Sequence, residues 1–194
     1  MLIDCNRPIA APDLVPEYSD GVKIPGNSDL SAEELSVRRS IFFDPYHAEI
    51  RKILDKFIGR KTIPILASIH SFAPFVSSNT EHRPWEISIC WDRDNRLAVP
   101  FISSLQGDGF CVGENQPYGF NALSDFAIPE HGLKRGIPHI LIEVRNDQIR
   151  DNSGVENWSQ RLTKLFNIEL ANPENLQVNH FGCPIASSDQ ISNN

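Results

Sequence analysis

The chain has 194 residues, of which 40% are hydrophobic and 22% are charged, a composition that suits one globular domain with a single sizeable core. Its formal net charge of −7 at pH 7 argues against a nucleic-acid-binding protein, because such proteins need a basic surface. The sequence has no apolar run of membrane-spanning length and no signal-peptide pattern at its start, so we expect a soluble, cytoplasmic protein without a membrane partner.

The chain begins with MLIDCNRP, a short apolar stretch followed by a polar cluster. Asp4, Asn6 and Arg7 come together before Pro8, which ends any regular structure. This pattern is typical of the end of a buried strand. Either an edge strand lies at the terminus, or a segment that should precede it is missing.

A proline-rich stretch and a long helix are expected next. Residues 8–28 hold four prolines and two glycines, which predicts a long surface loop of the kind that is often functional. Residues 31–59 have apolar side chains at helical spacing, with Pro45 expected to kink or split the helix. Ser31 and Glu34 form a capping box, in which the Glu34 side chain can reach back to the Ser31 amide.

Strands and helices then alternate along the chain. Short apolar runs predict strands at 62–70, 85–91, 110–119 and 136–147, and helical patterns lie at 96–109 and 154–170. The run at 62–70 suits a strand buried on both faces. The alternation predicts an α/β sandwich with a largely parallel sheet. We expect residues 1–170 to form one α/β domain and 171–194, rich in Asn, Ser, Pro and Gln, to form a flexible tail.

The four cysteines are widely spaced and match no CxxC pattern for a metal or redox site. They are Cys5, Cys90, Cys111 and Cys183. In a reducing compartment we expect all four to be free thiols.

Polar residues follow three of the apolar runs, at the strand ends where α/β sheets bind ligands. Asn6 and Arg7 follow LID, His70 follows PILASI, and Glu143 follows HILI. Arg7 alone could pair with Asp4, and a lone histidine is usually structural. Glu143 is harder to explain that way, because a carboxylate in an apolar run needs a partner or a shifted pKa. Together they offer a cation for a substrate anion, an imidazole suited to zinc and a general base, as in a hydrolase.

Several motifs in order resemble the N-formylglutamate amidohydrolase family over about residues 2–168: LIDCNRP, PGN, SIHSFAP, RPW, GENQPY and RGIPHILIEVRNDQI. The resemblance implies the fold of the zinc-carboxypeptidase and aspartoacylase-like superfamily. That fold is a three-layer, phosphorylase/hydrolase-like sandwich with a mixed, largely parallel sheet flanked by helices. It also implies a zinc-dependent hydrolase of the amide bond of an N-acyl amino acid, with N-formylglutamate giving formate and glutamate.

The resemblance assigns roles to four residues. Asn6 and Arg7 match the positions that hold the substrate carboxylate, His70 matches a zinc ligand, and Glu143 matches the glutamate that activates the metal-bound water. Arg145 lies in a matching stretch and is a further candidate for substrate contact. Weaker candidates are the loop residues Asn115, Tyr118, His131 and Arg135, for which ordinary surface polarity is the alternative explanation.

In the family, the motif that matches DCNR at 4–7 is preceded by a segment carrying the first metal ligands. The resemblance therefore implies a chain truncated at its amino terminus, with the other zinc ligands in the missing segment. His70 alone cannot hold zinc tightly, and the loss of a strand would expose a sheet edge.

Two other interpretations stay open. A non-catalytic carboxylate-binding protein would bind anions regardless of chelators. A non-functional fragment of the enzyme would expose apolar surface and dissolve poorly.

Overall fold

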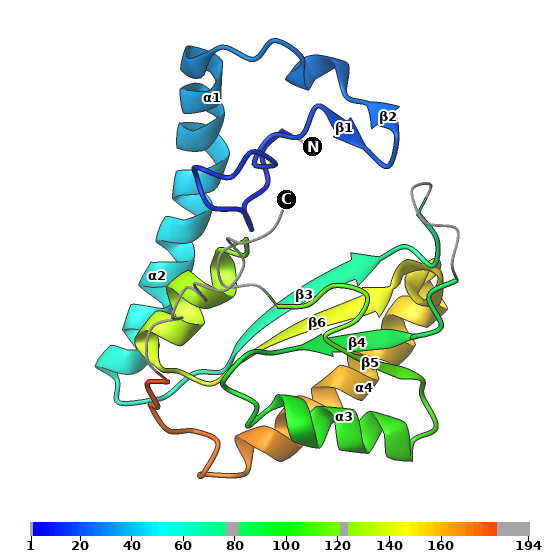
Figure 1. Ribbon diagram of the computed structural model, residues 1–194. Helices are drawn as coiled ribbons and strands as arrows, with labels where there is room; N and C mark the ends of the chain where they lie inside the picture. Colours follow the sequence, from blue (N-terminus) through cyan, green and yellow to red (C-terminus); the bar gives the residue numbers. More distant parts are fainter. Residues whose placement is uncertain (1, 77–81, 121–123, 182–194) are drawn as a thin grey trace, which may run out of the picture.

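The computed structural model describes residues 2–76, 82–120 and 124–181 (Figure 1). Its main sheet has four strands in the order β3-β6-β4-β5. The strands are β3 (Leu66–Phe72), β4 (Ile87–Cys90), β5 (Val112–Glu114) and β6 (His139–Arg145). β3 pairs with β6 and β4 with β5 in parallel, whereas β4 and β6 are antiparallel. The mixed sheet and its flanking helices confirm the predicted α/β class.

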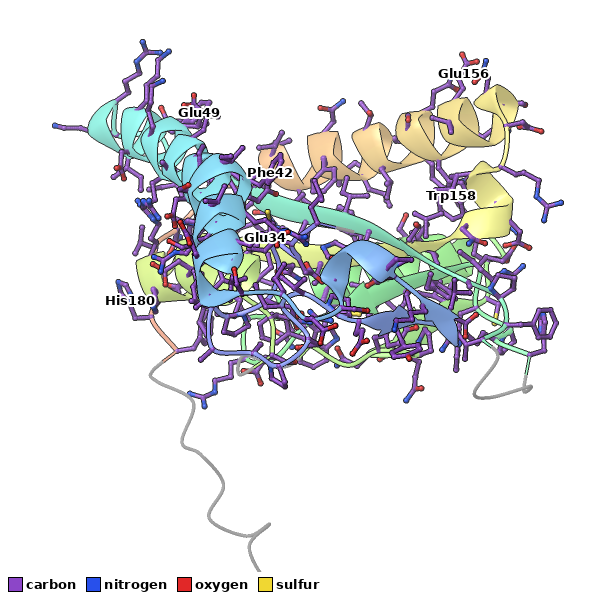
Figure 2. The ribbon with its side chains drawn as sticks, turned by 90° about the horizontal axis from the view of Figure 1, so that it is seen from above. Glu34, Phe42, Glu49, Glu156, Trp158 and His180 are labelled. Atoms are coloured by element: carbon purple, nitrogen blue, oxygen red, sulfur yellow. The ribbon has the colours of Figure 1, made fainter. Side chains whose placement is uncertain are left out.

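Two helices cover one face of this sheet. α3 (Ala98–Gly107) and α4 (Asn152–Leu170) pack there against apolar side chains of β4 and β6. Ile140 and Ile142 of β6 belong to this core, so the alternating residues Leu141 and Glu143 face the opposite side of the sheet. Seen from above, Trp158 of α4 points toward the sheet while Glu156 points away from it (Figure 2). The expected helices at 96–109 and 154–170 are therefore confirmed, with shifted ends.

The predicted long helix is split just before its proline. α1 (Ala32–Arg38) continues through a π-helical turn, η2 (Arg39–Phe43), into α2 (Asp44–Gly59). Pro45 lies in the first turn of α2, directly after the π-helical turn. A proline has no N–H for the helical hydrogen-bond ladder, and π-helical turns are one of the ways in which a helix accommodates such an interruption.

The capping box is only half formed. The Glu34 amide donates to Ser31 Oγ at 3.1 Å, as predicted. The Glu34 carboxylate, however, accepts from Arg38 Nη2 at 2.7 Å instead of returning to the Ser31 amide. A guanidinium one helical turn away is a stronger donor than a solvated amide, because it carries charge.

Ser31→Ala is expected to lower the free energy of unfolding by about 1 kcal/mol, because one amide of the first turn loses its acceptor. Urea denaturation followed by circular dichroism measures the change. Ser36→Ala, in the exposed interior of α1, is the matched control and should not destabilise the protein. An equal loss in both variants would contradict the capping role.

Two strand predictions are wrong. Residues 2–4 form no strand. β3 was expected to be buried on both faces, but within the described residues it has β6 as its one neighbour, and Ile69 is 58% exposed. The local sequence of an edge strand can be as apolar as that of a central one, so the periodicity did not separate the two.

The amino-terminal segment is fastened to α1 instead of to the sheet. The buried Arg38 guanidinium donates to Leu2 O at 3.0 Å, to Asn27 Oδ1 at 2.7 Å and to Gly26 O at 2.5 Å. The loop at 8–28 contains a small hairpin of β1 (Tyr18–Ser19) and β2 (Val22–Lys23), followed by η1 (Pro25–Asn27).

The last described residues of the chain lie against the domain. Residues 171–181 contact it, with the Asn179 amide donating to Gly136 O at 2.8 Å, whereas 182–194 lie outside the described residues.

Cys5, Cys90 and Cys111 are free thiols, as expected, and Cys183 is not among the described residues. No helix in the described ranges combines the length and the apolar character needed to cross a bilayer.

Candidate active site

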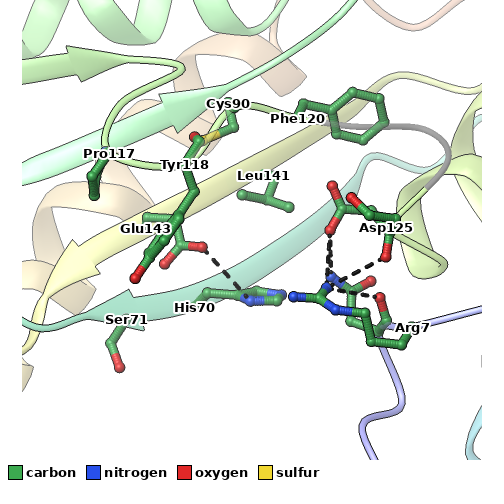
Figure 3. Close-up of a pocket in the computed structure, with 13 residues that line it drawn as sticks. Arg7, His70, Ser71, Cys90, Pro117, Tyr118, Phe120, Asp125, Leu141 and Glu143 are labelled. Carbon is green, nitrogen blue, oxygen red and sulfur yellow. Dashed lines mark hydrogen bonds and ion pairs between the residues drawn. The ribbon is translucent and has the colours of Figure 1, made fainter. Parts of the chain in front are cut away.

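A cavity of about 400 Å³ lies on the face of the sheet opposite α3 and α4 (Figure 3). It collects residues that are far apart in sequence. Five of the predicted site residues line it: Asn6, Arg7, His70, Tyr118 and Glu143. The lining also includes Cys90 and Asp125, which no sequence motif marked as site residues.

The strand register places His70 beside Glu143. The two residues are direct partners in the parallel pairing of β3 with β6, and Ser88 of β4 is opposite Glu143 on the other side. His70 Nδ1 lies 3.9 Å from Glu143 Oε1, and His70 Nε2 lies 3.0 Å from Ser68 Oγ. Both residues lie inside strands, each two residues before its strand ends at Phe72 or Arg145. The sheet itself is therefore the floor of the cavity.

The protonation equilibrium of Glu143 is shifted into the physiological range. Burial and the nearby Asp125 charge raise the pKa of this carboxyl to about 7, against the opposing effect of Arg7 and Arg83. Burial lowers the pKa of His70, so its imidazole is neutral near pH 7. The cavity thus holds a carboxyl group that can take up or release a proton near neutral pH.

Arg7 brings a positive charge to the same cavity. Its Nε donates to Asp13 Oδ2 at 2.8 Å, and its Nη1 lies 3.3 Å from Asn6 O and 3.5 Å from Asp125 Oδ1. Among the described residues, no hydrogen bond from Nη2 is found. The side chain is 29% exposed, and Figure 3 shows the guanidinium beside His70. The protein therefore holds Nε and Nη1, and Nη2 is the nitrogen with which Arg7 can meet a substrate anion.

Asn6 joins two parts of the chain. Its Oδ1 accepts from the amides of Phe126 at 3.2 Å and Ala127 at 2.9 Å, and its Nδ2 donates to Asp125 Oδ1 at 3.2 Å. The Asn6 side chain, which was predicted to bind the substrate carboxylate, is thus bonded to protein groups through both its oxygen and its nitrogen. Asn6 fixes the position of Arg7 relative to Asp125.

Four of the predicted substrate contacts do not line the cavity. Arg145 is buried and donates to the backbone oxygens of Arg83 and Pro84. The other three are held by protein partners: Asn115 by the Trp91 amide at 2.9 Å, Arg135 by Asp55 at 2.6 Å, and His131 by His47 at 2.9 Å. Each polar side chain has a partner that its own sequence neighbourhood does not reveal.

Tyr118, by contrast, lines the cavity. Its hydroxyl accepts from Arg83 Nη1 at 3.0 Å, and the Arg83 guanidinium lies 4.9 Å from the centre of its ring. The ring is thereby held in place at the cavity wall.

The environment of Cys90 disfavours a role as nucleophile. Burial raises the pKa of its thiol to about 11, with further increases from the charges of Glu143 and Asp125. The protonated thiol donates to Tyr118 O at 3.2 Å. A thiol that stays protonated at neutral pH cannot attack an amide carbonyl, so the chemistry of the cavity rests on its oxygen and nitrogen groups.

The zinc ion that the resemblance implies does not fit the described residues. His70 and Glu143 provide two donors, and no group of three His, Cys, Asp or Glu within the described ranges could hold a metal ion. Catalytic zinc sites usually have three protein ligands.

Comparison with known proteins places the chain in a family. Residues 1–150 match the family model described as N-formylglutamate amidohydrolase. The crystal structure of the Atu2144 gene product from Agrobacterium tumefaciens is similar, with 31% identity and a TM-score of 0.82 over 89% of this chain and 68% of that one. The N-formylglutamate amidohydrolase of Ralstonia eutropha JMP134 shares the fold, with 18% identity and a TM-score of 0.60 over 84% of this chain and 70% of that one.

A search of curated proteins finds no match. The family model nevertheless covers most of the chain. The matched residues include the strands of the mixed sheet and the residues that line the cavity. The chain belongs to the N-formylglutamate amidohydrolase family, a family of amide hydrolases.

Proposed function

We propose that this protein hydrolyses the amide bond of an N-acyl amino acid, with N-formylglutamate as the first candidate substrate. One observation carries the proposal. A carboxyl group with a pKa of about 7, Glu143, shares a cavity of about 400 Å³ with the Arg7 guanidinium, whose Nη2 makes no hydrogen bond to the described residues. This pair suits a substrate that has both a carboxylate and an amide.

Arg7 orients the substrate in the proposed mechanism. Its Nη2 donates to the substrate carboxylate in a charge-assisted hydrogen bond, which directs the N-acyl group toward the strands. Asp13 holds Nε of the guanidinium, so little side-chain entropy is lost on binding.

Glu143 acts as the general base. It removes a proton from a water molecule as the water oxygen attacks the acyl carbon. The same carboxyl then gives the proton to the amide nitrogen as the carbon–nitrogen bond breaks. The products are the free amino acid and formate, and Glu143 returns to its ionised form. His70, neutral and 3.9 Å from Glu143, lies beside the reacting groups.

A carboxylate-binding protein without catalysis is the second candidate. The incomplete set of metal donors around His70 favours it, because Arg7 could still bind an anion there. Zinc chemistry of the kind implied by the family resemblance would need further donors in addition to His70 and Glu143.

Hydrolysis and zinc content measured on the same purified chain test the proposal. We expect formate release from N-formyl-L-glutamate and, because two donors bind zinc weakly, clearly less than one zinc per chain by elemental analysis. Binding of the substrate without formate release would favour the second candidate. Absence of both binding and turnover would contradict both.

One zinc per chain, with turnover lost on chelation, would contradict the expected low zinc content. It would show that donors in addition to His70 and Glu143 complete a metal site. Restoring the zinc after chelation is the control for damage by the chelator.

A further inference from the structure

Two buried histidines connect α2, the amino-terminal segment and the irregular helix η3 (Ile128–Gly132). His47 is 1% exposed and His131 is 0% exposed. His47 Nδ1 lies 2.9 Å from His131 Nε2, and His47 Nε2 lies 2.8 Å from the carbonyl oxygen of Cys5. Cys5 is two residues before Arg7 in the chain.

The carbonyl of Cys5 fixes the direction of both hydrogen bonds. A carbonyl only accepts, so His47 Nε2 carries the proton that it donates to Cys5 O. In a neutral imidazole, His47 Nδ1 is then an acceptor, and His131 Nε2 donates to it. Burial lowers the pKa of both imidazoles, that of His131 to about 4 with a further decrease from the charge of His47, which agrees with a neutral pair.

This order leaves His131 Nδ1 as a buried acceptor without a hydrogen-bond partner among the described residues. Buried polar atoms without partners are rare and destabilising. An apolar side chain would fill the same space between Phe126 and α2 without that penalty. An imidazole buried at this cost indicates a task for its donor, Nε2.

The segment around Arg7 is tied to η3 in two ways. Asn6 Oδ1 accepts from the amides of Phe126 and Ala127, directly before η3 begins. His131, inside η3, is hydrogen-bonded to His47, and His47 is hydrogen-bonded to the Cys5 carbonyl. Arg7 itself closes a turn, with its amide donating to Asp4 O at 3.2 Å.

We propose that His47 and His131 are positioning residues that fix the Arg7 guanidinium for binding the substrate carboxylate. The inference rests on the proposed function, in which Arg7 binds that carboxylate. The pair does not touch the substrate. It holds the backbone of Cys5 against α2, so that the turn bearing Arg7 has one position over the sheet.

Binding of N-formyl-L-glutamate by calorimetry tests this role in three variants. His131→Leu removes the donor and is expected to weaken binding about tenfold, a coupling typical of residues in one hydrogen-bond network. His131→Gln keeps an N–H donor at a similar reach and should restore most of the affinity. Asn175→Leu, which removes a buried hydrogen bond to Glu169 in α4, is the matched control and should bind like the wild type.

The Arg7→Ala background separates positioning from general destabilisation. If His131 acts through Arg7, His131→Leu weakens binding no further once Arg7 is absent. An equal weakening in both backgrounds would overturn the inference. In the turnover assay, the same role predicts a raised KM for His131→Leu with little change in kcat.

The outcomes also separate this inference from the proposed function. If Arg7→Ala binds as well as the wild type, the carboxylate-binding role of Arg7 fails, and the positioning role fails with it. If Arg7→Ala weakens binding but His131→Leu does not, only the positioning role fails. Nitrogen-15 spectra of the imidazoles add a test independent of substrate, because a proton on His47 Nδ1 at pH 7 would overturn the hydrogen-bond order.

Discussion

Glu143→Gln is expected to lower kcat for amide hydrolysis by about 10² to 10⁴, the usual contribution of a general base. Glutamine has nearly the same shape and keeps the contacts of the side chain in β6, but it cannot accept a proton from water. Formate release from N-formyl-L-glutamate measures the loss. Substrate affinity should change little, because in the proposed mechanism Arg7 binds the carboxylate.

Glu169→Gln is the matched control for this substitution. Glu169 is also buried and also has a pKa raised by burial, but it lies in α4 and accepts a hydrogen bond from Asn175. We expect its kcat to equal that of the wild type. A similar loss in both variants would attribute the effect to a damaged fold and not to the base.

The pH dependence of the wild type follows from the same carboxyl. A base must be ionised, so kcat/KM is expected to rise with pH through a midpoint near 7, where Glu143 loses its proton. An ordinary glutamate would give a midpoint near 4.5. A midpoint that low would show that Glu143 is not the group that controls the rate.

The raised pKa also has a consequence for stability. The folded state binds the Glu143 proton more tightly than the unfolded state, so the carboxyl contributes stability below about pH 4.5 that is lost as pH rises through 7. Glu143→Gln has no ionisable carboxyl at this position, so its stability does not fall in this way as the pH rises through 7. At pH 8 the variant should therefore resist denaturant better than the wild type while being a poorer catalyst, a combination that a disrupted fold could not produce.

β6 shows why part of the site could be predicted from the sequence. A carboxylate inside a run as apolar as IPHILIEV needs a special environment, and that requirement alone selected Glu143. The structure adds what no local pattern contains, namely the register that sets His70 opposite it. Asp125 could not be found, since it is 118 residues from Arg7 in sequence, and only the folded chain brings their side chains within 3.5 Å.

The contacts of a polar side chain are hard to predict from the sequence when its partners lie in loops. Arg145 and Asn6 both lie in matching stretches, yet their donors and acceptors serve backbone groups of Arg83 and Ala127. Such partners come from loops, whose paths are not set by hydrophobic periodicity. The sequence therefore predicts which residues are unusual better than it predicts what each of them contacts.

Arg7→Ala is expected to raise KM for N-formyl-L-glutamate by about 10- to 150-fold. This corresponds to about 1.5 to 3 kcal/mol, the typical contribution of a hydrogen bond to a charged group. Arg7→Lys keeps the charge but loses the planar guanidinium that Asp13 and Asp125 hold in place, so its KM should lie between those of Arg7→Ala and the wild type. Steady-state kinetics of formate release measure both variants.

A change in the substrate makes the test specific. An analogue whose α-carboxylate is replaced by a carboxamide should be a poorer substrate for the wild type by about the factor that Arg7→Ala loses. The Arg7→Ala variant should hardly distinguish the two compounds, because the group that separates them has gone. Arg161→Lys is the matched control, since Arg161 is similarly exposed and pairs with Asp108 outside the cavity. If Arg7→Ala still preferred the carboxylate as strongly as the wild type does, another cation would have to bind it.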